Sequence, residues 1–497
     1  MMRKSTAMVA MLAAVVLTLN ACGSDTEPQH ITAPKAADYA AMLRQRVTTD
    51  AMFAHLERLQ QIAYDHDGHR AVGTPGYAAS VDYVVNALRN KGFDVQTPEF
   101  EFRQFHADPP ALTVGGATVG ANPLEYSLGT PPQGVTGPLV VAPADDTPGC
   151  SASDYGSLPV TGAVALVNRG SCEFSAKEQV AVERGAVALI VVDNAVEDQM
   201  GGTLGAETAV KIPVISVTKA DGARLRAQPG ATTTVKLNAR VDNIKASNVI
   251  AQTKTGSTQN VVMVGAHLDS VRAGPGINDN GSGVAAVLET ALQLGSSPPV
   301  QNAVRFGFWG AEEVGLIGSD RYLETLDVDQ LKDIALYLNF DMIASPNPGF
   351  FTYDGDQSAP QKPADPAPRV PEGSAGIERT LVAYLTSAGK TAEDTSFQGR
   401  SDYVGFTKAG IPAGGLFTGA EEKKTADQVA LWGGEAGQPF DPNYHQKTDT
   451  LDHIDRATLG INGGGVAYAV GLYAQDEGGR NGVPIRQDRT RQAITKS

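Results

Sequence analysis

Apolar residues recur along this chain at two spacings, and the two spacings alternate. Residues 38–66 place large apolar side chains at helical intervals, and residues 76–88 do so again after a Gly-Thr-Pro turn. Short apolar runs bounded by glycine and polar residues are typical of buried strands. These runs lie at 93–95, 139–141, 163–167, 188–192, 212–217, 247–250, 261–266 and 337–340, with helical stretches at 175–184, 220–227 and 284–294. The alternation predicts an α/β fold.

The character of the sequence changes between residues 125 and 243, where glycine, valine and alanine dominate. The main pattern resumes afterwards and continues to about residue 475, so we interpret the chain as one domain interrupted by an inserted domain. We expect the polar tail to be disordered. The predicted parts are a leader at 1–21, a tether at 22–38, the main domain at 39–124 and 244–475, the insert at 125–243, and the tail at 476–497.

The first residues have the pattern of an export signal. Arg3 and Lys4 precede an apolar stretch, 7–19, that is short for a membrane span. Residues 19–24 then resemble a bacterial lipobox in which Cys22 receives the lipid. A plain cleaved signal peptide with an incidental cysteine is the alternative. We expect an exported protein anchored to the outer face of the cell membrane through Cys22, either retained there or shed.

Cysteine usage fits export. With Cys22 consumed by the lipid, Cys150 and Cys172 remain as a pair. An exported protein can keep such a pair oxidised, so we predict a disulfide, with two free buried thiols as the alternative.

Length and charge narrow the classes of partner. At 497 residues the chain is too long for one ordinary domain. The net charge of -15 and the absence of Lys or Arg runs argue against nucleic acid as a partner. We expect a monomer.

Three apolar strands end on a histidine or an acid, and another acid stands in a glycine-rich turn before a helix. In open α/β sheets the binding crevice forms at the carboxyl ends of strands, so these side chains could converge. Imidazole and carboxylate groups together are what a pair of zinc ions prefers. The candidate ligands are His267, Asp279, Glu313, Asp341 and His445.

Each of these residues also has an ordinary structural interpretation. A single acid at a strand end is most often a turn or helix cap, and a lone histidine is most often a packed or surface residue. Asp279 could cap the helix 284–294, with Asn280 and Gly281 as its turn, and the cap does not exclude a ligand role. The joint pattern is what favours metal binding.

Longer motifs surround the candidate ligands. They read His-Leu-Asp-Ser at 267–270, Gly-Ile-Asn-Asp-Asn-Gly-Ser-Gly at 276–283, Trp-Gly-Ala-Glu-Glu at 309–313, Asn-Phe-Asp-Met at 339–342, Gly-Arg-Ser-Asp at 399–402 and Asp-Pro-Asn-Tyr-His at 441–445. From about 247 to 470 the chain resembles the co-catalytic di-zinc aminopeptidases, and among them the secreted Streptomyces-type leucine aminopeptidases. The insert, with Gly-Ala-Val-Ala-Leu-Val-Asn-Arg-Gly at 162–170, resembles a protease-associated domain.

The resemblance implies a fold and an activity. The fold is the zinc exopeptidase fold, a mixed and mostly parallel sheet flanked by helices, with an inserted β-rich α+β protease-associated domain. The activity is hydrolysis of N-terminal residues from peptides with a free N-terminus, through a water held by two Zn²⁺ ions. Nothing in the sequence supports a Ca²⁺ site.

The resemblance also distributes the metal ligands. Asp279 would bridge the two ions, His267 and Asp341 would complete one site, and Glu313 and His445 would complete the other.

Four further residues take roles beside the metals. Asp269 is placed to accept the second imidazole N–H of His267 and orient the ring. Neighbouring side chains of an extended segment point apart, so Glu312 would face the water as general base, or remain an acid without a proton-transfer role. Tyr444 would donate to the oxyanion, or simply pack beside the site. Arg400 would hold the substrate, or form a surface ion pair.

The pocket and two departures from the family complete the comparison. Met342 and Phe417 match positions that line the pocket for the first residue, which favours large apolar residues such as leucine. Asn443 and Thr448 stand where relatives often carry bridging cysteines, so packing and hydrogen bonds must hold that loop. Tyr403 stands where several relatives carry histidine.

Three rival functions have weaker support. A carboxypeptidase of the same superfamily needs basic residues to hold a C-terminal carboxylate, and only Arg400 is an obvious candidate. A glutaminyl cyclase relative would work with a single zinc ion. A lipid-anchored binding protein on a decayed peptidase fold would have lost part of the ligand set, and here all of it is present.

Overall fold

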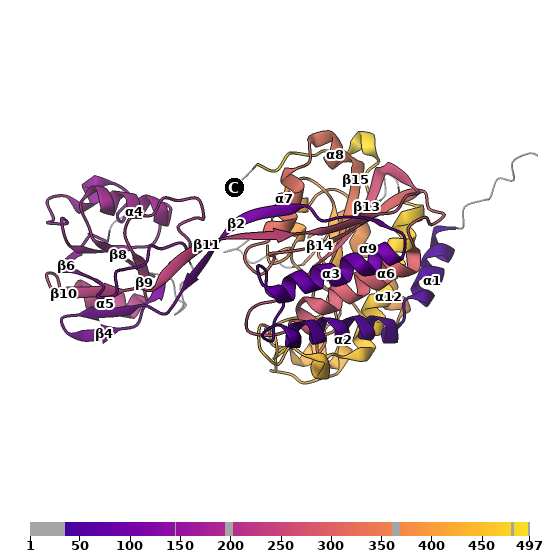
Figure 1. Cartoon of the computed structure of the whole chain (residues 1–497), viewed down its shortest axis with the longest axis horizontal. Helices are drawn as coiled ribbons and strands as arrows, with labels where there is room; N and C mark the ends of the chain where they lie inside the picture. The colour runs from indigo at the N-terminus through magenta and orange to yellow at the C-terminus, as the bar shows by residue number, and fades with distance from the viewer. Residues whose placement is uncertain (1–34, 145, 194–201, 360–367, 479–481, 496–497) are drawn as a thin grey trace, which may run out of the picture.

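The computed structural model describes residues 35–144, 146–193, 202–359, 368–478 and 482–495. They form two domains joined by a long two-stranded ribbon, as Figure 1 shows. Both ends of the described chain belong to the larger domain, and its middle forms the smaller one. Within these ranges no helix is long and apolar enough to cross a membrane. The predicted leader and the lipid site at Cys22 lie outside the described residues and stay predictions.

The larger domain is built on an eight-stranded mixed sheet. Its four central strands are parallel, and strands on either side of them pair antiparallel with this group. In spatial order the strands are β1 (Asp94–Gln96), β12 (Val249–Gln252), β14 (Asn302–Trp309), β13 (Ser257–His267), β15 (Ile334–Phe340), β18 (Ala413–Phe417), β16 (Phe351–Tyr353) and β17 (Glu393–Thr395). The mixed, mostly parallel sheet predicted from the sequence is confirmed.

Helices cover both faces of this sheet, which explains why its central strands are mostly apolar. In β15, Leu336 and Leu338 pack into one apolar cluster and Tyr337 into the other. The first cluster includes α1 (Ala36–Arg46), α2 (Thr49–Asp65), α3 (Pro75–Asn90), α6 (Gly283–Leu294), α9 (Ser374–Ser387) and α12 (Arg456–Gln475). The second includes α7 (Ile317–Glu324), α8 (Val328–Asp333) and α10 (Tyr403–Lys408), while α11 (Ala426–Trp432) packs its last residue on Phe351.

The smaller domain has its own eight-stranded sheet and its own apolar clusters. The strands are, in spatial order, β4 (Ala117–Val119), β3 (Ala111–Val114), β10 (Thr232–Lys236), β6 (Val135–Val141), β7 (Val164–Asn168), β8 (Ala188–Val192), β9 (Val214–Val217) and β5 (Asn122–Pro123), with helices α4 (Phe174–Glu183) and α5 (Lys219–Arg226). The predicted start at residue 125 is therefore wrong. Strands β3 to β5 precede it, and they are too short and too exposed to give an apolar run.

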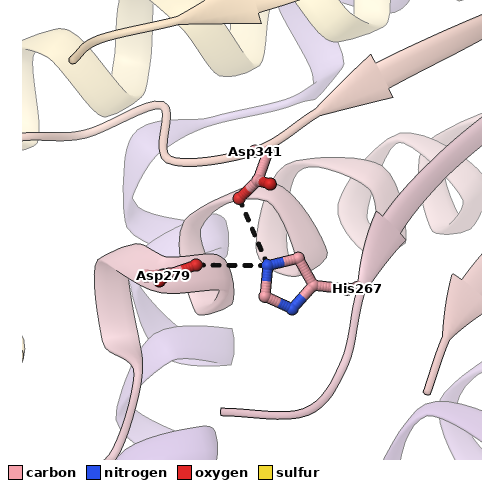
Figure 2. Close-up of side chains that lie close together, drawn as sticks. All are labelled: His267, Asp279 and Asp341. Atoms are coloured by element: carbon pink, nitrogen blue, oxygen red, sulfur yellow. Dashed lines mark hydrogen bonds and ion pairs between the residues drawn. The ribbon is translucent and has the colours of Figure 1, made fainter. Parts of the chain in front are cut away.

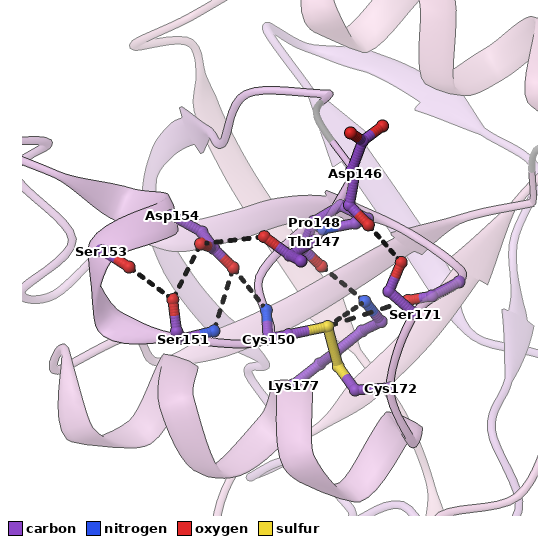
Figure 3. Close-up of a disulfide and its surroundings, with 11 residues drawn as sticks. Asp146, Thr147, Pro148, Cys150, Ser151, Ser153, Asp154, Ser171, Cys172 and Lys177 are labelled. Carbon is purple, nitrogen blue, oxygen red and sulfur yellow. Dashed lines mark hydrogen bonds between the residues drawn. A yellow bond between two sulfur atoms is a disulfide. The ribbon is translucent and has the colours of Figure 1, made fainter.

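The disulfide lies in the smaller domain and joins Cys150 to Cys172 (Figure 3). The Asp154 carboxylate accepts the backbone N–H of Cys150 at 2.8 Å, and the ammonium of the buried Lys177 lies 3.4 Å from the Cys150 sulfur. The pairing predicted from the cysteine arithmetic is thus present in the structure.

The ribbon between the domains consists of β2 (Glu99–Ala107) and β11 (Ala239–Ser247), paired antiparallel over their whole length. Strand β11 leads directly into β12, which runs antiparallel to β14. The carboxyl ends of the central parallel strands therefore lie at the end of the sheet from which the ribbon leaves (Figure 1).

The tail after Asp476 is ordered where the structure describes it, so the prediction of disorder is wrong. Val483 is fully buried, and the Arg489 side chain is 0% exposed. The Arg489 guanidinium donates to the carbonyls of Gln259, Lys332 and Pro484 and to the side chains of Asn260 and Glu477. The many charged residues of the tail suggested exposure to solvent, but the guanidinium groups of Arg489 and Arg491 donate to backbone carbonyls of the larger domain.

Candidate metal centre

The five predicted ligands come from five separate segments and meet at one edge of the larger sheet. His267 is the last residue of β13, Asp341 follows β15, and Glu313 lies shortly after β14. Asp279 stands in the turn before α6, and His445 in the loop before α12. The convergence expected at the carboxyl ends of parallel strands is what the structure shows.

Three of these side chains form a first group (Figure 2). Nε2 of His267 lies 3.1 Å from Oδ1 of Asp279 and 3.3 Å from Oδ1 of Asp341. The imidazole is 1% exposed, so water cannot compete for this nitrogen.

A second group shares one member with the first. Nε2 of His445 lies 3.2 Å from Oδ2 of Asp279 and 3.0 Å from Oε2 of Glu313. Asp279 thus offers one carboxylate oxygen to each group, as a bridging ligand does.

The donor atoms fit zinc. Tetrahedral zinc with bonds of about 2.0–2.1 Å places neighbouring ligand atoms roughly 3.3 Å apart, close to the distances in both groups. Each imidazole nitrogen faces two carboxylate oxygens, although it can form a hydrogen bond to only one of them. Within the part of the chain that the structure describes, Oε1 of Glu313 and Oδ1 of Asp341 are buried and have no hydrogen-bond partner. A cation placed among these atoms would satisfy all of them.

Burial and crowding shift the acid–base behaviour of the site. Burial raises the pKa of Glu313 to about 7, and the neighbouring Asp279 adds to the rise. Burial lowers the pKa of His445, but hydrogen bonds to Asp279 and Glu313 outweigh it and raise that pKa to about 10. Metal ligands bind in their deprotonated forms, so a divalent cation entering the site displaces these protons.

Asp269 contacts the His267 ring, which it was predicted to orient, and also the backbone of a second segment. Nδ1 of His267 lies 3.7 Å from the Asp269 carboxylate but 3.2 Å from its backbone carbonyl, so the carbonyl is the nearer acceptor. The carboxylate accepts the backbone N–H groups of Glu312 and Glu313 at 3.2 and 3.3 Å. Asp269 therefore also fixes the segment that carries both glutamates.

The side chains of Glu312 and Glu313 have different neighbours, as predicted, but the cause is not an extended backbone. The segment after β14 is a turn rather than an extended strand, and Ala311 and Leu316 adopt positive φ angles. Oε2 of Glu313 contacts His445, whereas Oε2 of Glu312 lies 3.9 Å from His267 Nε2 and lines the cavity. Burial raises the pKa of Glu312 well above its usual value. Glu312 belongs to neither ligand group.

Arg400 and Tyr444 form one unit at the cavity. The Arg400 guanidinium donates to the Tyr444 hydroxyl at 3.2 Å and pairs with Glu421 at 2.8 Å. The Tyr444 ring stacks on the imidazole of His445, with centroids 3.8 Å apart. Arg400 therefore forms the ion pair and also lines the cavity, while its role in holding the substrate stays a prediction.

A cavity of about 510 Å³ opens beside the two ligand groups. Met342 and Phe417 line it, as the sequence predicted. Phe351, Tyr353 and Phe440 add to this apolar lining, and Glu312, Glu313 and Asp341 form part of the polar lining.

Sequence reasoning missed two buried groups that hold the ligand loops. The Asp449 carboxylate accepts the backbone N–H groups of Asn278 and Asp279 at 2.7 and 3.0 Å. The Arg70 guanidinium donates to backbone carbonyls of the loop that follows His267. Asp449 stands in a loop without a flanking strand, so the strand-end pattern could not find it. Its position four residues after His445 is the one available signal.

The structure accounts for the two departures from the family pattern, namely the missing cysteines at Asn443 and Thr448 and the tyrosine at position 403. Backbone hydrogen bonds hold the loop around His445, among them Gln446 N–H to Asn443 and Asp449 N–H to Gln446. The loop that lacks cysteines is held as predicted. Tyr403 is 3% exposed, and its hydroxyl oxygen accepts the backbone N–H groups of Gly399 and Arg400. It therefore stabilises the turn that carries Arg400.

A third acidic group, Asp354, Glu378 and Asp394, also has carboxylate oxygens close together. Its members are distant in sequence, which explains why no motif indicated them. Backbone N–H groups of the loop after β16 already bind Asp354 and Glu378.

Comparisons with known proteins agree with this geometry. The model of Peptidase family M28 matches residues 248–470, and the PA domain model matches residues 135–225. The chain is 69% identical to the Mycobacterium tuberculosis protein named "Probable lipoprotein aminopeptidase LpqL", with 100% of both chains covered. It is 40% identical to leucine aminopeptidase 2 of Arthroderma otae, covering 89% of this chain and 87% of the relative.

Two solved structures share the fold. The aminopeptidase from Aneurinibacillus sp. strain AM-1 has a TM-score of 0.69 and 27% identity, covering 90% of this chain and 98% of that one. A zinc aminopeptidase from Bacillus subtilis has a TM-score of 0.61 and 26% identity, covering 88% and 98%.

Proposed function

This chain belongs to peptidase family M28 and is a zinc-dependent aminopeptidase, and we propose that its centre holds two Zn²⁺ ions that share Asp279. The observation that carries the proposal is the pair of ligand groups, each at zinc-like spacing, with one oxygen of Asp279 in each. Bound zinc supplies a water of lowered pKa and polarises the scissile carbonyl.

Glu312 is the proton carrier in this proposal. It lines the cavity and belongs to neither ligand group, so its carboxylate is free to take the proton of the attacking water. It then returns the proton to the nitrogen of the leaving peptide. Its raised pKa suits a group that must both accept and release a proton.

Tyr444 and Arg400 serve the carbonyl oxygen. Burial raises the pKa of Tyr444, so its hydroxyl keeps its proton and can donate it in a hydrogen bond. The Arg400 guanidinium fixes the position of this hydroxyl. The developing negative charge on the carbonyl oxygen would meet a donor that is already in place.

The charge around the cavity favours an amine over a carboxylate. Apart from the candidate metal ligands, the cavity lining carries Glu312 and Glu422, acids that attract an α-ammonium group and repel a C-terminal carboxylate. Arg400 is already engaged by Glu421 and Glu422, at 2.8 and 3.4 Å. This arrangement favours aminopeptidase over carboxypeptidase activity.

The apolar wall selects the first residue of the substrate. Met342, Phe351 and Phe417 present apolar surface beside the ligand groups, so large apolar side chains such as leucine gain most from binding. The names of the leucine aminopeptidase relatives support the same preference.

We further propose that the protein is exported and held at the outer face of the membrane by a lipid on Cys22. The name of the 69% identical relative, which includes the word lipoprotein, supports this placement. The substrates are peptides with a free N-terminus, and the protein acts as a monomer.

Metal removal tests the centre. Purified protein stripped with a chelator should lose turnover of leucyl arylamide and recover it when zinc is added, reaching full activity near two ions per chain. An N-acetylated leucyl arylamide should remain uncleaved, since it lacks the ammonium. Turnover that survives complete metal removal, or release of residues from the C-terminus of a tagged peptide, would contradict the proposal.

A further inference from the structure

A continuous line of hydrogen bonds runs from the buried core to Asp341. Trp309 Nε1–H donates to the Tyr337 hydroxyl at 2.8 Å, and the Tyr337 O–H donates to Oδ1 of Asn339 at 3.0 Å. Nδ2–H of Asn339 donates to the Ser401 hydroxyl at 2.8 Å, and the Ser401 O–H donates to Oδ2 of Asp341 at 2.7 Å. The line begins in the indole and ends at a metal ligand.

The direction of this line is fixed by its first member. An indole N–H can only donate, so the Tyr337 oxygen accepts, and its own hydrogen must go to the amide oxygen of Asn339. The Asn339 amide nitrogen then donates to the Ser401 hydroxyl oxygen, which acts as the acceptor. The remaining Ser401 hydrogen therefore points at Asp341. Each donor in the chain polarises the next one.

Burial keeps the line intact. Trp309 and Tyr337 are fully buried, and Asn339 and Ser401 are 1% and 4% exposed. Tyr337 also stacks on Phe406, with ring centroids 3.7 Å apart. Water cannot replace these donors, and the side chains cannot turn away from one another.

The two oxygens of Asp341 are thereby made unequal. Oδ2 accepts the Ser401 hydrogen, whereas Oδ1 has no hydrogen-bond partner among the described residues and lies 3.3 Å from His267 Nε2. We propose that Ser401 is a positioning residue that makes Asp341 offer one defined oxygen to its metal ion. This inference rests on the two-zinc centre proposed above.

A hydroxyl is well suited to this task. It adds no charge beside a ligand group that already contains several acids. Without it, Asp341 could rotate and its second oxygen would lose its partner. Because Asp341 belongs only to the group with His267, the loss should affect one metal ion and spare the other.

Ser401→Ala tests the inference, with Ser80→Ala as matched control. Ser80 is also fully buried, but it binds a backbone carbonyl within α3, away from the site. Zinc affinities are measured by competition with a chromogenic chelator, and Co²⁺ absorption reports the two sites. In Ser401→Ala, one ion should bind about 10- to 100-fold more weakly, the effect typical of groups that orient metal ligands. The second ion should bind unchanged, and Ser80→Ala should match the native protein.

Two outcomes would overturn the inference: native affinity for both ions in Ser401→Ala, or equal loss of both. Ser401→Thr keeps the hydroxyl and should restore the weakened site. The melting temperature of the metal-free variants shows whether the fold has survived. If the native protein itself binds a single ion, the proposed function fails instead, so the two failures are distinguishable.

Discussion

The proposed roles of Glu312 and Glu313 can be distinguished by replacing each carboxylate with a neutral amide and measuring turnover and zinc content. Glu312→Gln keeps shape and hydrogen bonding but cannot carry a proton, so turnover should fall by about 10²- to 10⁴-fold with zinc content near two ions. Glu313→Gln should instead weaken the site formed with His445, since an amide is a poorer ligand than a carboxylate. Kinetics and elemental analysis of both variants check this. Zinc loss in Glu312→Gln, with full zinc in Glu313→Gln, would reverse the assignment.

Asp449 should affect both ions, because it holds the backbone of the shared ligand Asp279. In Asp449→Asn one carboxylate oxygen becomes an NH₂ group, which faces a backbone N–H and repels it. We expect both zinc affinities to fall, each by about 10- to 100-fold. Asp452→Asn, an exposed acid in the same loop, is the control and should change neither. A loss confined to one ion would show that Asp449 acts elsewhere.

The five candidate ligands could be brought together from sequence because each stands in a motif or at the end of an apolar run. The groups that hold them could not. Asp269 was assigned to the His267 ring, while its contacts to Glu312 and Glu313 depend on a turn that no periodicity predicts. Ser401 lay within a recognised motif, but its role depends on residues from two strands.

At the scale of elements, a helix or strand could be predicted from sequence when it contained a run or a regular spacing of apolar residues. Strands β13 and β15 and helix α6 were located because they are buried on one or both faces. Strands β3 to β5 were missed because they are short and half exposed. The tail was missed because its buried groups are cationic, and their carbonyl partners are invisible in sequence.

The tail should contribute to stability through Arg489. Arg489→Ala removes a buried cation and leaves the carbonyls of Gln259 and Lys332 unpaired, so we expect a loss of roughly 3–5 kcal/mol in the free energy of unfolding. Urea titration of the metal-loaded protein measures it. Arg456→Ala, whose exposed ion pair with Asp50 is worth about 0–1 kcal/mol, is the control. Equal effects of the two substitutions would show that the tail does not stabilise the domain.

At the scale of the whole molecule, the two domains are separable. Among the residues that the structure describes, none in the apolar clusters of the larger domain comes from the segment 108–238. Ala107 and Ala239 pair at the far end of the ribbon, so an Asn-Gly turn between them can replace the insert as a hairpin. The shortened protein should fold, bind zinc and cleave leucyl arylamide at the native rate. Loss of zinc or solubility would show that the insert supports the catalytic domain.

The packing of α1 against α12 has a consequence for biogenesis. A β-carbon added at Gly471 in α12 would lie only 2.8 Å from the Cα of Ala40 in α1. Helix α1, the first described helix, therefore packs closely on α12, the last long one. The ribosome delivers these two helices at opposite ends of synthesis. The catalytic domain therefore cannot close while the chain is still emerging. For the export proposed above, this delay would keep the catalytic domain open until its last long helix has been made.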